Sequence, residues 1–190
     1  MSLAGSLRRR GAVGTAAAAA RIGRDWIVSR LWWLWYEAVA ARAMRRRRFA
    51  FDGAERPYVL HPYNTTYRSE RAVELPLAFA ELDARPGARV LEVGNVVSHY
   101  RPVAHDVLDK YERVDGIVNR LEGYRPGAAR IVNEDVMAFA PSAPYGLILS
   151  ISTLEHVGWD ETPREPAKLR AALERLAGML APGGLLFLTV

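Results

Sequence analysis

The stretch RVLEVGNVVSHY, residues 89–100, decides the fold class of this chain. It opens with an apolar run that carries an acid near its end and is followed by Gly94. A strand that runs into a glycine turn is typical of nucleotide cradles in α/β proteins, where the backbone must approach a ligand closely. After Gly94, however, the chain supplies Asn95, Val96 and Val97 instead of further glycines. Because a β-branched residue resists the left-handed backbone that glycine permits, Val96 raises the question of whether this cradle still binds a ligand.

Charge is distributed unevenly along the 190 residues. Residues 1–50 hold 11 arginines against Asp25 and Glu37, a net charge of +9, whereas residues 51–190 hold 15 basic and 19 acidic residues, a net charge of −4. The basic balance therefore belongs to the N-terminal part, and no nucleic-acid partner is predicted for the main domain. Cysteine is absent, which excludes disulfides, thiolate metal ligands and a cysteine nucleophile. No metal site is predicted.

Composition divides the chain into four parts. Residues 1–24 are rich in alanine, glycine and arginine and are predicted to be a disordered tail. Residues 25–48 hold four of the five tryptophans, lack proline and glycine, and are predicted to form a helix that ends in arginines. Residues 49–87 read as a lead-in segment and a helix, and residues 88–190 as an α/β domain.

Two interpretations of the segment 25–48 stay open. Its apolar run is too short to span a bilayer, and Trp26 and Trp33 fall on the same face as Arg30. One interpretation is an interfacial helix, with tryptophans at the lipid headgroups and arginines on anionic phosphates. The other is a helix packed against its own domain or a partner. The predicted location is therefore cytoplasmic, with peripheral membrane contact through residues 25–48 under the first interpretation.

The lead-in segment carries a helix and a polar cluster before it. Apolar spacing over residues 73–82 predicts a helix that packs on a sheet, with Pro76 in or near its first turn. The polar residues either close over a substrate or cap the helix through hydrogen bonds; they are His61, Tyr63, Asn64, Thr65 and Arg68.

From Ala88 onward, apolar runs and loops alternate. The clearest helix lies within residues 161–180, where leucines recur at spacings of three and four. Near-continuous apolar runs indicate strands covered on both faces, so the pattern predicts a doubly wound, mostly parallel α/β sheet. Because the last run ends the chain, we expect a fold truncated after its fifth strand. The predicted strands cover residues 88–93, 105–111, 129–135, 145–152 and 185–190.

Four motifs follow these strands in order. LEVG (91–94) ends the first, NED (133–135) follows the third, SISTLEHV (150–157) follows the fourth, and LAPGG (180–184) leads into the fifth. In this order they resemble the class I S-adenosylmethionine-dependent methyltransferases, whose seven-stranded sheet would be covered through its first five strands. The GNVxSHY continuation is similar to a divergent bacterial branch of that family. The resemblance implies a Rossmann-like fold and S-adenosylmethionine as the cofactor.

The resemblance also implies roles in the first loop. Glu92 and Gly94 would line the methionine side of the cofactor. Asn95 and Ser98 would belong to the same binding loop, where Ser98 replaces a glycine with a small hydrogen-bond donor.

Further along, two acids would hold the adenosine part. Asp109 would accept from both ribose hydroxyls, with Asp115 as the alternative because its distance from Gly94 is nearer the usual spacing. Asp135 would accept from the adenine amino group, with Val136 or Met137 against the ring.

His156 is the candidate catalytic residue. Its imidazole suits proton transfer near neutral pH, although a positioning or packing role is the alternative. His99, Tyr100 and the segment 159–161 are candidates for facing the substrate.

The leading hypothesis is therefore a methyltransferase that acts on a small molecule or a glycan. A non-catalytic member that keeps the fold as a scaffold or binding protein is the first alternative, and Val96 in place of a glycine would be the feature that indicates it. A nicotinamide dehydrogenase is disfavoured, because the dinucleotide fingerprint needs glycines at Val96 and near His99.

Overall fold

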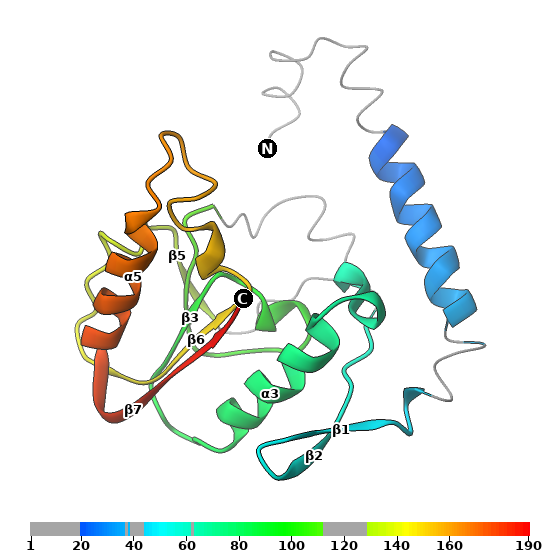
Figure 1. The fold of residues 1–190 in the computed structure, drawn as a ribbon, viewed down its shortest axis with the longest axis horizontal. Helices are drawn as coiled ribbons and strands as arrows, with labels where there is room; N and C mark the ends of the chain where they lie inside the picture. The colour runs from blue at the N-terminus through cyan, green and yellow to red at the C-terminus, as the bar shows by residue number, and fades with distance from the viewer. Residues whose placement is uncertain (1–19, 37, 39–43, 62, 112–128) are drawn as a thin grey trace. The chain divides into compact units, whose positions relative to one another are not determined.

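The computed structural model describes residues 20–36, 38, 44–61, 63–111 and 129–190 (Figure 1). These residues fall into two compact units, Met1–Ala72 and Val73–Val190, each described here by itself.

The first unit contains a helix, a hairpin and a short 3₁₀ helix. The N-terminal helix covers residues 20–36, so it takes in residues 20–24, which the sequence had assigned to a disordered tail. Alanine and arginine are good helix formers, and they extend the helix beyond the tryptophan-rich part. The hairpin, which the sequence analysis did not predict, pairs β1 (Arg48–Phe51) with β2 (Ala54–Pro57) through Asp52 and Gly53, both at positive φ. The 3₁₀ helix η1 is Tyr63–Arg68.

The second unit is built on a five-stranded parallel sheet. Its strands lie in the order β5-β4-β3-β6-β7. This is the doubly wound order, with β3, the first strand of the sheet, in the centre and a switch point between β3 and β6. Each strand overlaps an apolar run predicted from the sequence. The strands are β3 (Val90–Val93), β4 (Asp106–Leu108), β5 (Arg130–Val132), β6 (Tyr145–Ile151) and β7 (Leu180–Thr189).

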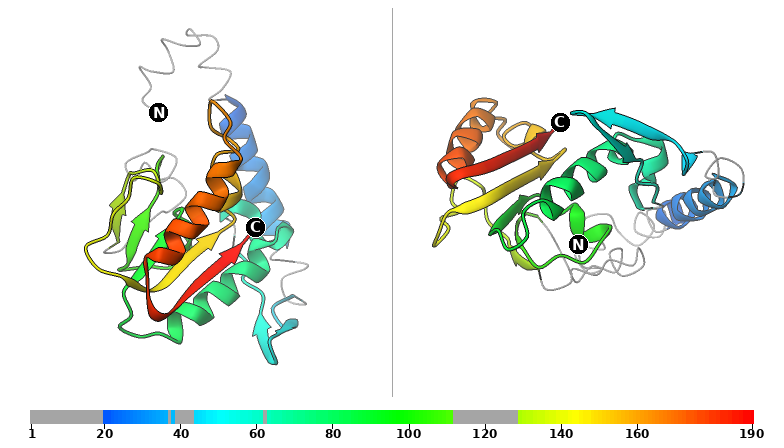
Figure 2. Two further views of the ribbon diagram at one scale, coloured as in Figure 1. Left: turned by 60° about the vertical axis from the view of Figure 1, so that its left-hand side comes forward. Right: turned by 90° about the horizontal axis from the view of Figure 1, so that it is seen from below.

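Helices cover both faces of this sheet (Figure 2). On one face, α5 (Ala167–Gly178) buries Ala172 and Leu176 against Leu91, Val93 and Ile148. On the other face, α3 (Arg71–Asp83) packs Ala78 and Leu82 against apolar side chains of the sheet and of the loop after β3. The predicted doubly wound α/β architecture is therefore confirmed.

The helix predicted within residues 161–180 is confirmed as α5, Ala167–Gly178. One predicted boundary needs correction. The LAPGG turn expected to separate that helix from a strand at 185 lies within β7, which starts at Leu180 and shows a register irregularity opposite Tyr145 and Leu147.

Candidate functional site

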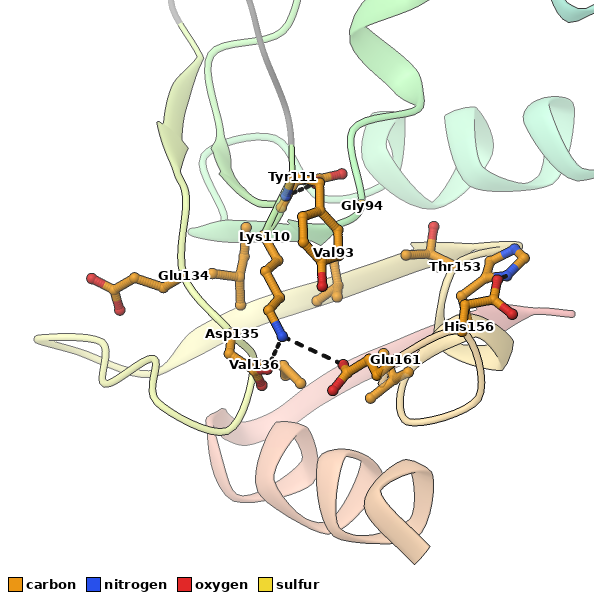
Figure 3. Close-up of a pocket in the computed structure, with 14 residues that line it drawn as sticks. Val93, Gly94, Lys110, Tyr111, Glu134, Asp135, Val136, Thr153, His156 and Glu161 are labelled. Atoms are coloured by element: carbon orange, nitrogen blue, oxygen red, sulfur yellow. Dashed lines mark hydrogen bonds and ion pairs between the residues drawn. The ribbon is translucent and has the colours of Figure 1, made fainter. Parts of the chain in front are cut away.

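A cavity of about 320 Å³ lies at the carboxyl ends of the parallel strands (Figure 3). This is the end of a doubly wound sheet at which ligands bind, next to the switch point. Its walls come from the segments that follow β3, β4, β5 and β6, so residues distant in sequence converge there. The lining residues are Val93, Gly94, Leu108, Asp109, Lys110, Tyr111, Glu134, Asp135, Val136, Thr153, His156, Val157, Asp160 and Glu161.

Gly94 is the point where the loop after β3 meets the segment after β6. Its φ is +83°, and a Cβ added there would lie 2.3 Å from Oγ1 of Thr153. Both the backbone conformation and the close approach therefore require glycine at this position.

Val96 does not carry the strain that its sequence position suggested. Its φ is −113° and its ψ −53°, a right-handed conformation open to any residue. Its side chain packs with the apolar cluster that includes Phe79 and Leu82 of α3, and it is not among the residues that line the cavity. The loop therefore turns without a second glycine and leaves the cavity open.

Four N–H groups of this loop donate to other groups within the protein. The N–H of Gly94 donates to the carbonyl oxygen of Leu108 at 2.9 Å, and that of Asn95 to Oδ2 of Asp109 at 3.2 Å. The N–H groups of Val96 and Val97 both donate to Oε1 of Glu92, at 2.8 and 2.7 Å. A loop that binds phosphate does so by pointing its N–H groups at the anion. In this loop, four N–H groups already donate within the protein.

Glu92 organises the loop from behind. Its side chain is fully buried, and its Oε2 lies 2.8 Å from Nε2 of His105. Side chains alternate along a strand, so Glu92 points away from the face on which Val93 lines the cavity. The structure therefore places Glu92 beneath the loop and not on the ligand-facing surface predicted for it.

Asn95 and Ser98 are likewise turned into the loop. Both are buried, and the Ser98 hydroxyl donates to the side-chain oxygen of Asn95. Neither lines the cavity. Of the four loop residues predicted to bind a cofactor, Gly94 is the one at the cavity surface.

Asp109 does lie at the cavity, directly after β4. Its Oδ2 accepts from the N–H of Asn95, and its Oδ1 accepts from the N–H of Tyr111 at 2.8 Å. These bonds fix the carboxylate between the ends of β3 and β4. The alternative, Asp115, lies outside the described residues.

Asp135 belongs to a charge network on the cavity wall (Figure 3). Its Oδ2 accepts from the ammonium groups of Lys110 at 2.8 Å and Lys168 at 2.6 Å, and Lys168 also reaches Glu161 at 2.7 Å. Burial opposes ionisation of Asp135, but the two lysines and the N–H of Met137 outweigh it and hold its pKa well below the usual range. The hydrogen bond to Lys168 likewise lowers the pKa of Glu161. The network ties the segments after β4, β5 and β6 together.

Sequence reasoning gave no role to Lys110, Lys168 or Thr153. One signal was present: the chain has only two lysines among its 26 basic residues, and the structure brings both to the same carboxylates. An ammonium can donate to several acceptors around one nitrogen, whereas arginine presents its donors in a planar fork. Lysine suits a point where two carboxylates converge.

His156 lines the cavity and is paired with an acid. Its Nδ1 lies 2.6 Å from Oδ2 of Asp160, four residues along the chain. The side chain is 60% exposed, so the imidazole stands at the solvent side of the cavity. If Asp160 accepts from Nδ1–H, Nε2 is left as the basic nitrogen.

The remaining candidates divide between the cavity and its surroundings. Val136, Asp160 and Glu161 line it, whereas Met137 and Trp159 do not. His99 and Tyr100 are half-buried beside the loop and also do not line it.

The polar cluster in the first unit forms a hydrogen-bonded turn. The hydroxyl of Thr66 accepts from the N–H of His61 at 2.6 Å, and Nδ1 of His61 accepts from the N–H of Tyr63 at 3.0 Å. Burial, together with the charge of Arg30, lowers the pKa of His61, which keeps Nδ1 free of a proton for this bond. Both bonds lie within residues 61–66 and neither reaches α3, so the choice between a helix cap and a substrate-facing loop stays open. Among the residues described, no group of three or more histidines and acids is placed to hold a metal ion.

Strand order and two covering helices define a Rossmann-like α/β protein, and its cavity lies at the carboxyl edge of the sheet. Neither a family model nor a curated protein sequence matches this chain. Solved structures do match its fold.

Three of these structures show the extent of the likeness. The N-methyltransferase NodS from Bradyrhizobium japonicum WM9, in complex with S-adenosyl-L-homocysteine, is 20% identical, with a TM-score of 0.47 over 62% of this chain and 59% of that one. The glycopeptide N-methyltransferase MtfA complexed with S-adenosyl-L-homocysteine is 18% identical, with a TM-score of 0.42 over 68% and 60%. The DhpI–SAM–HEP complex is 19% identical, with a TM-score of 0.43 over 65% and 56%. This chain thus spans about three fifths of the lengths of the structures it matches.

Proposed function

We propose that this chain binds S-adenosylmethionine in the cavity and transfers the methyl group to a small-molecule or glycan acceptor. The observation that carries the proposal is the combination of an acidic cavity with a loop in which four N–H groups already donate within the protein. Five carboxylates and one lysine line the cavity. Such a site repels phosphate and attracts a cation, and the ligand proposed carries a sulfonium.

The acids are proposed to bind different parts of the ligand. Asp109, fixed at the end of β4, accepts from the ribose hydroxyls, as a carboxylate with free lone pairs can. Asp135 stands on the far side of the cavity, where it would face the adenine amino group beside the apolar side chain of Val136. Gly94, without a side chain, lets the methionine part lie close to the loop.

In methyl transfer, the sulfonium supplies a carbon that an acceptor lone pair attacks, and the electron pair of the broken C–S bond stays on sulfur. Nε2 of His156 would take the proton that the acceptor loses, and Asp160 would stabilise the resulting imidazolium through Nδ1–H. The cavity walls would hold donor and acceptor in line, which supplies much of the rate enhancement for such a transfer.

Titration calorimetry on the complete protein tests the proposal with S-adenosylmethionine, S-adenosylhomocysteine and NAD. We expect the first two to bind and NAD not to bind. Asp109→Asn should weaken both bound ligands about tenfold, the cost of a charge-assisted pair of hydrogen bonds. The matched control is Glu174→Gln, an exposed acid on α5 whose partner is Arg170 and which does not line the cavity.

The other outcomes separate the alternatives. Binding of NAD would assign the site to a dehydrogenase, and binding of none of the three would favour a scaffold that keeps only the fold. The glycan acceptor depends on peripheral membrane contact through residues 25–48, which would bring a cytoplasmic enzyme to a lipid-linked acceptor.

A further inference from the structure

The N-terminal helix has two unlike faces. Trp33 and Tyr36, three residues apart, pack on Tyr67 of η1, with ring centroids 5.4 and 4.4 Å away. Tyr36 is only 7% exposed. This face is therefore the one by which the helix is held within its own unit.

On the opposite side of the helix, apolar side chains are exposed among the described residues. Ile27, Leu31, Leu34 and Trp35 are 53%, 60%, 62% and 55% exposed. Their spacings of four, seven and eight residues place them on one side of a helix. A soluble monomer rarely exposes a contiguous apolar face of this kind, so it marks an interaction surface.

Exposed arginines flank this apolar face in the sequence. Arg21 and Arg24 lie in the helix before it, with Arg24 paired to Asp25 at 2.9 Å, and the exposed run Arg45–Arg48 follows the helix along the chain. From residue 20 to 48 the chain holds eight arginines and two acids, a net charge of +6. The segment that carries the apolar face is thus strongly cationic.

We propose that this face binds the surface of an anionic lipid bilayer, with the helix lying in the interface. Leucine, isoleucine and tryptophan would enter the boundary between headgroups and acyl chains, while the arginines meet lipid phosphates. No described helix has the length and apolar character needed to cross a membrane, so the helix lies on the bilayer. The proposal does not depend on methyl transfer.

Charge favours lipid over a second copy of the chain as the occupant. In a parallel pair of helices over residues 20–36, Arg21 and Arg24 meet their own copies, and in an antiparallel pair the two segments 20–48, each with a net charge of +6, still lie against one another. Either arrangement sets like charges against one another, which destabilises the pair. An anionic bilayer presents the complementary charge along the whole helix.

Co-sedimentation of the whole chain with vesicles tests the proposal. We expect binding to vesicles of phosphatidylglycerol and phosphatidylcholine, and much weaker binding to phosphatidylcholine alone. Leu31→Glu should lower the partition coefficient at least tenfold, because it places a charge where an apolar side chain would enter the bilayer. Arg46→Ala together with Arg47→Ala should lower it about 25-fold at low salt, about fivefold for each arginine, and less at high salt.

Trp159→Ala is the matched control, since Trp159 is 52% exposed but lies in the second unit. Because Leu31 is exposed, its variant should keep the wild-type circular dichroism. Failure of the wild type to sediment with anionic vesicles would overturn the proposal. If Leu31→Glu then abolished a concentration-dependent dimer, the face would belong to a second copy. If no dimer formed either, the face would be covered by the second unit of the same chain.

Discussion

Replacing Gly94 with alanine tests the contact on which the geometry of the cavity depends. The new Cβ would meet Oγ1, Cγ2 and Cβ of Thr153 at 2.3, 2.6 and 2.8 Å. It would also hold a non-glycine residue at a φ of +83°. The left-handed backbone costs about 1–2 kcal/mol, and overpacking at the contact costs about 1–3 kcal/mol more. We therefore expect Gly94→Ala to lower the free energy of unfolding by about 3 kcal/mol.

A second glycine separates the two costs. Gly87 has a φ of +80°, but a Cβ added there meets nothing within 4 Å. Gly87→Ala should therefore show the backbone cost alone, about 1 kcal/mol once the reduced entropy of the unfolded chain is included. Urea unfolding followed by circular dichroism compares the two variants directly.

Thr153→Ala in the Gly94→Ala background removes the two nearest contacts and leaves the Cβ at 2.8 Å. The double variant should regain part of the lost stability, which additive effects would not give. If Gly94→Ala were no less stable than Gly87→Ala, the loop after β3 would not pack on Thr153, and the position of the cavity wall would be wrong.

Three further perturbations address the carboxylates and the far end of the sheet. Lys168→Met should cost about 1–3 kcal/mol at pH 7, less than a fully buried pair because Asp135 and Glu161 keep about a fifth of their exposure. Because the pKa of Asp135 is lowered in the folded protein, its ionised carboxylate stabilises the fold above about pH 4, and this stabilisation is lost as the pH falls further. The stability difference between Lys168→Met and the wild type should therefore narrow below about pH 4 in acid unfolding curves. A stability difference that stayed constant would contradict this reasoning. Glu92→Ala should lower both stability and ligand affinity, measured by urea unfolding and titration calorimetry. Glu92→Gln keeps one acceptor for the loop N–H groups and should lose less in both assays. Equal losses in the two variants would show that these N–H groups do not need the acceptor at Glu92. Tyr145→Phe removes a hydroxyl that donates to Asp106 at 2.7 Å, and it should lower the free energy of unfolding by about 1–2 kcal/mol without changing ligand affinity. In the wild type, burial and this hydrogen bond raise the pKa of Tyr145 to about 12, which spectrophotometric titration checks.

The sheet could be predicted from the sequence because its signal is local. Strands covered on both faces must be apolar over most of their length, and the runs that contain Leu91, Val107 and Ile148 record this directly. The hairpin of the first unit also had a local signal, the pair Asp52–Gly53 between short runs, which was not recognised as a turn.

The site was less predictable because its contacts join distant segments. Asp135 is bonded to lysines 25 and 33 residues away, a pairing that no spacing reveals. The direction of Glu92, in contrast, followed from strand alternation: if Val93 faces the cavity, its neighbour cannot. The roles of Asp109, Asp135 and His156 toward a ligand remain predictions, although all three reach the cavity.

Glu92 explains why the loop after Gly94 needs no further glycines. Because the buried carboxylate of Glu92 accepts from Val96 and Val97, the chain closes into the 3₁₀ turn η2 (Val97–His99) with right-handed backbone, which side chains tolerate. Glycine is then needed only where the strand ends. Four N–H groups of this loop therefore already donate within the protein, and the five carboxylates that line the cavity disfavour phosphate. The site thus suits a cationic ligand better than a pyrophosphate, which is why we favour a sulfonium donor over a dinucleotide.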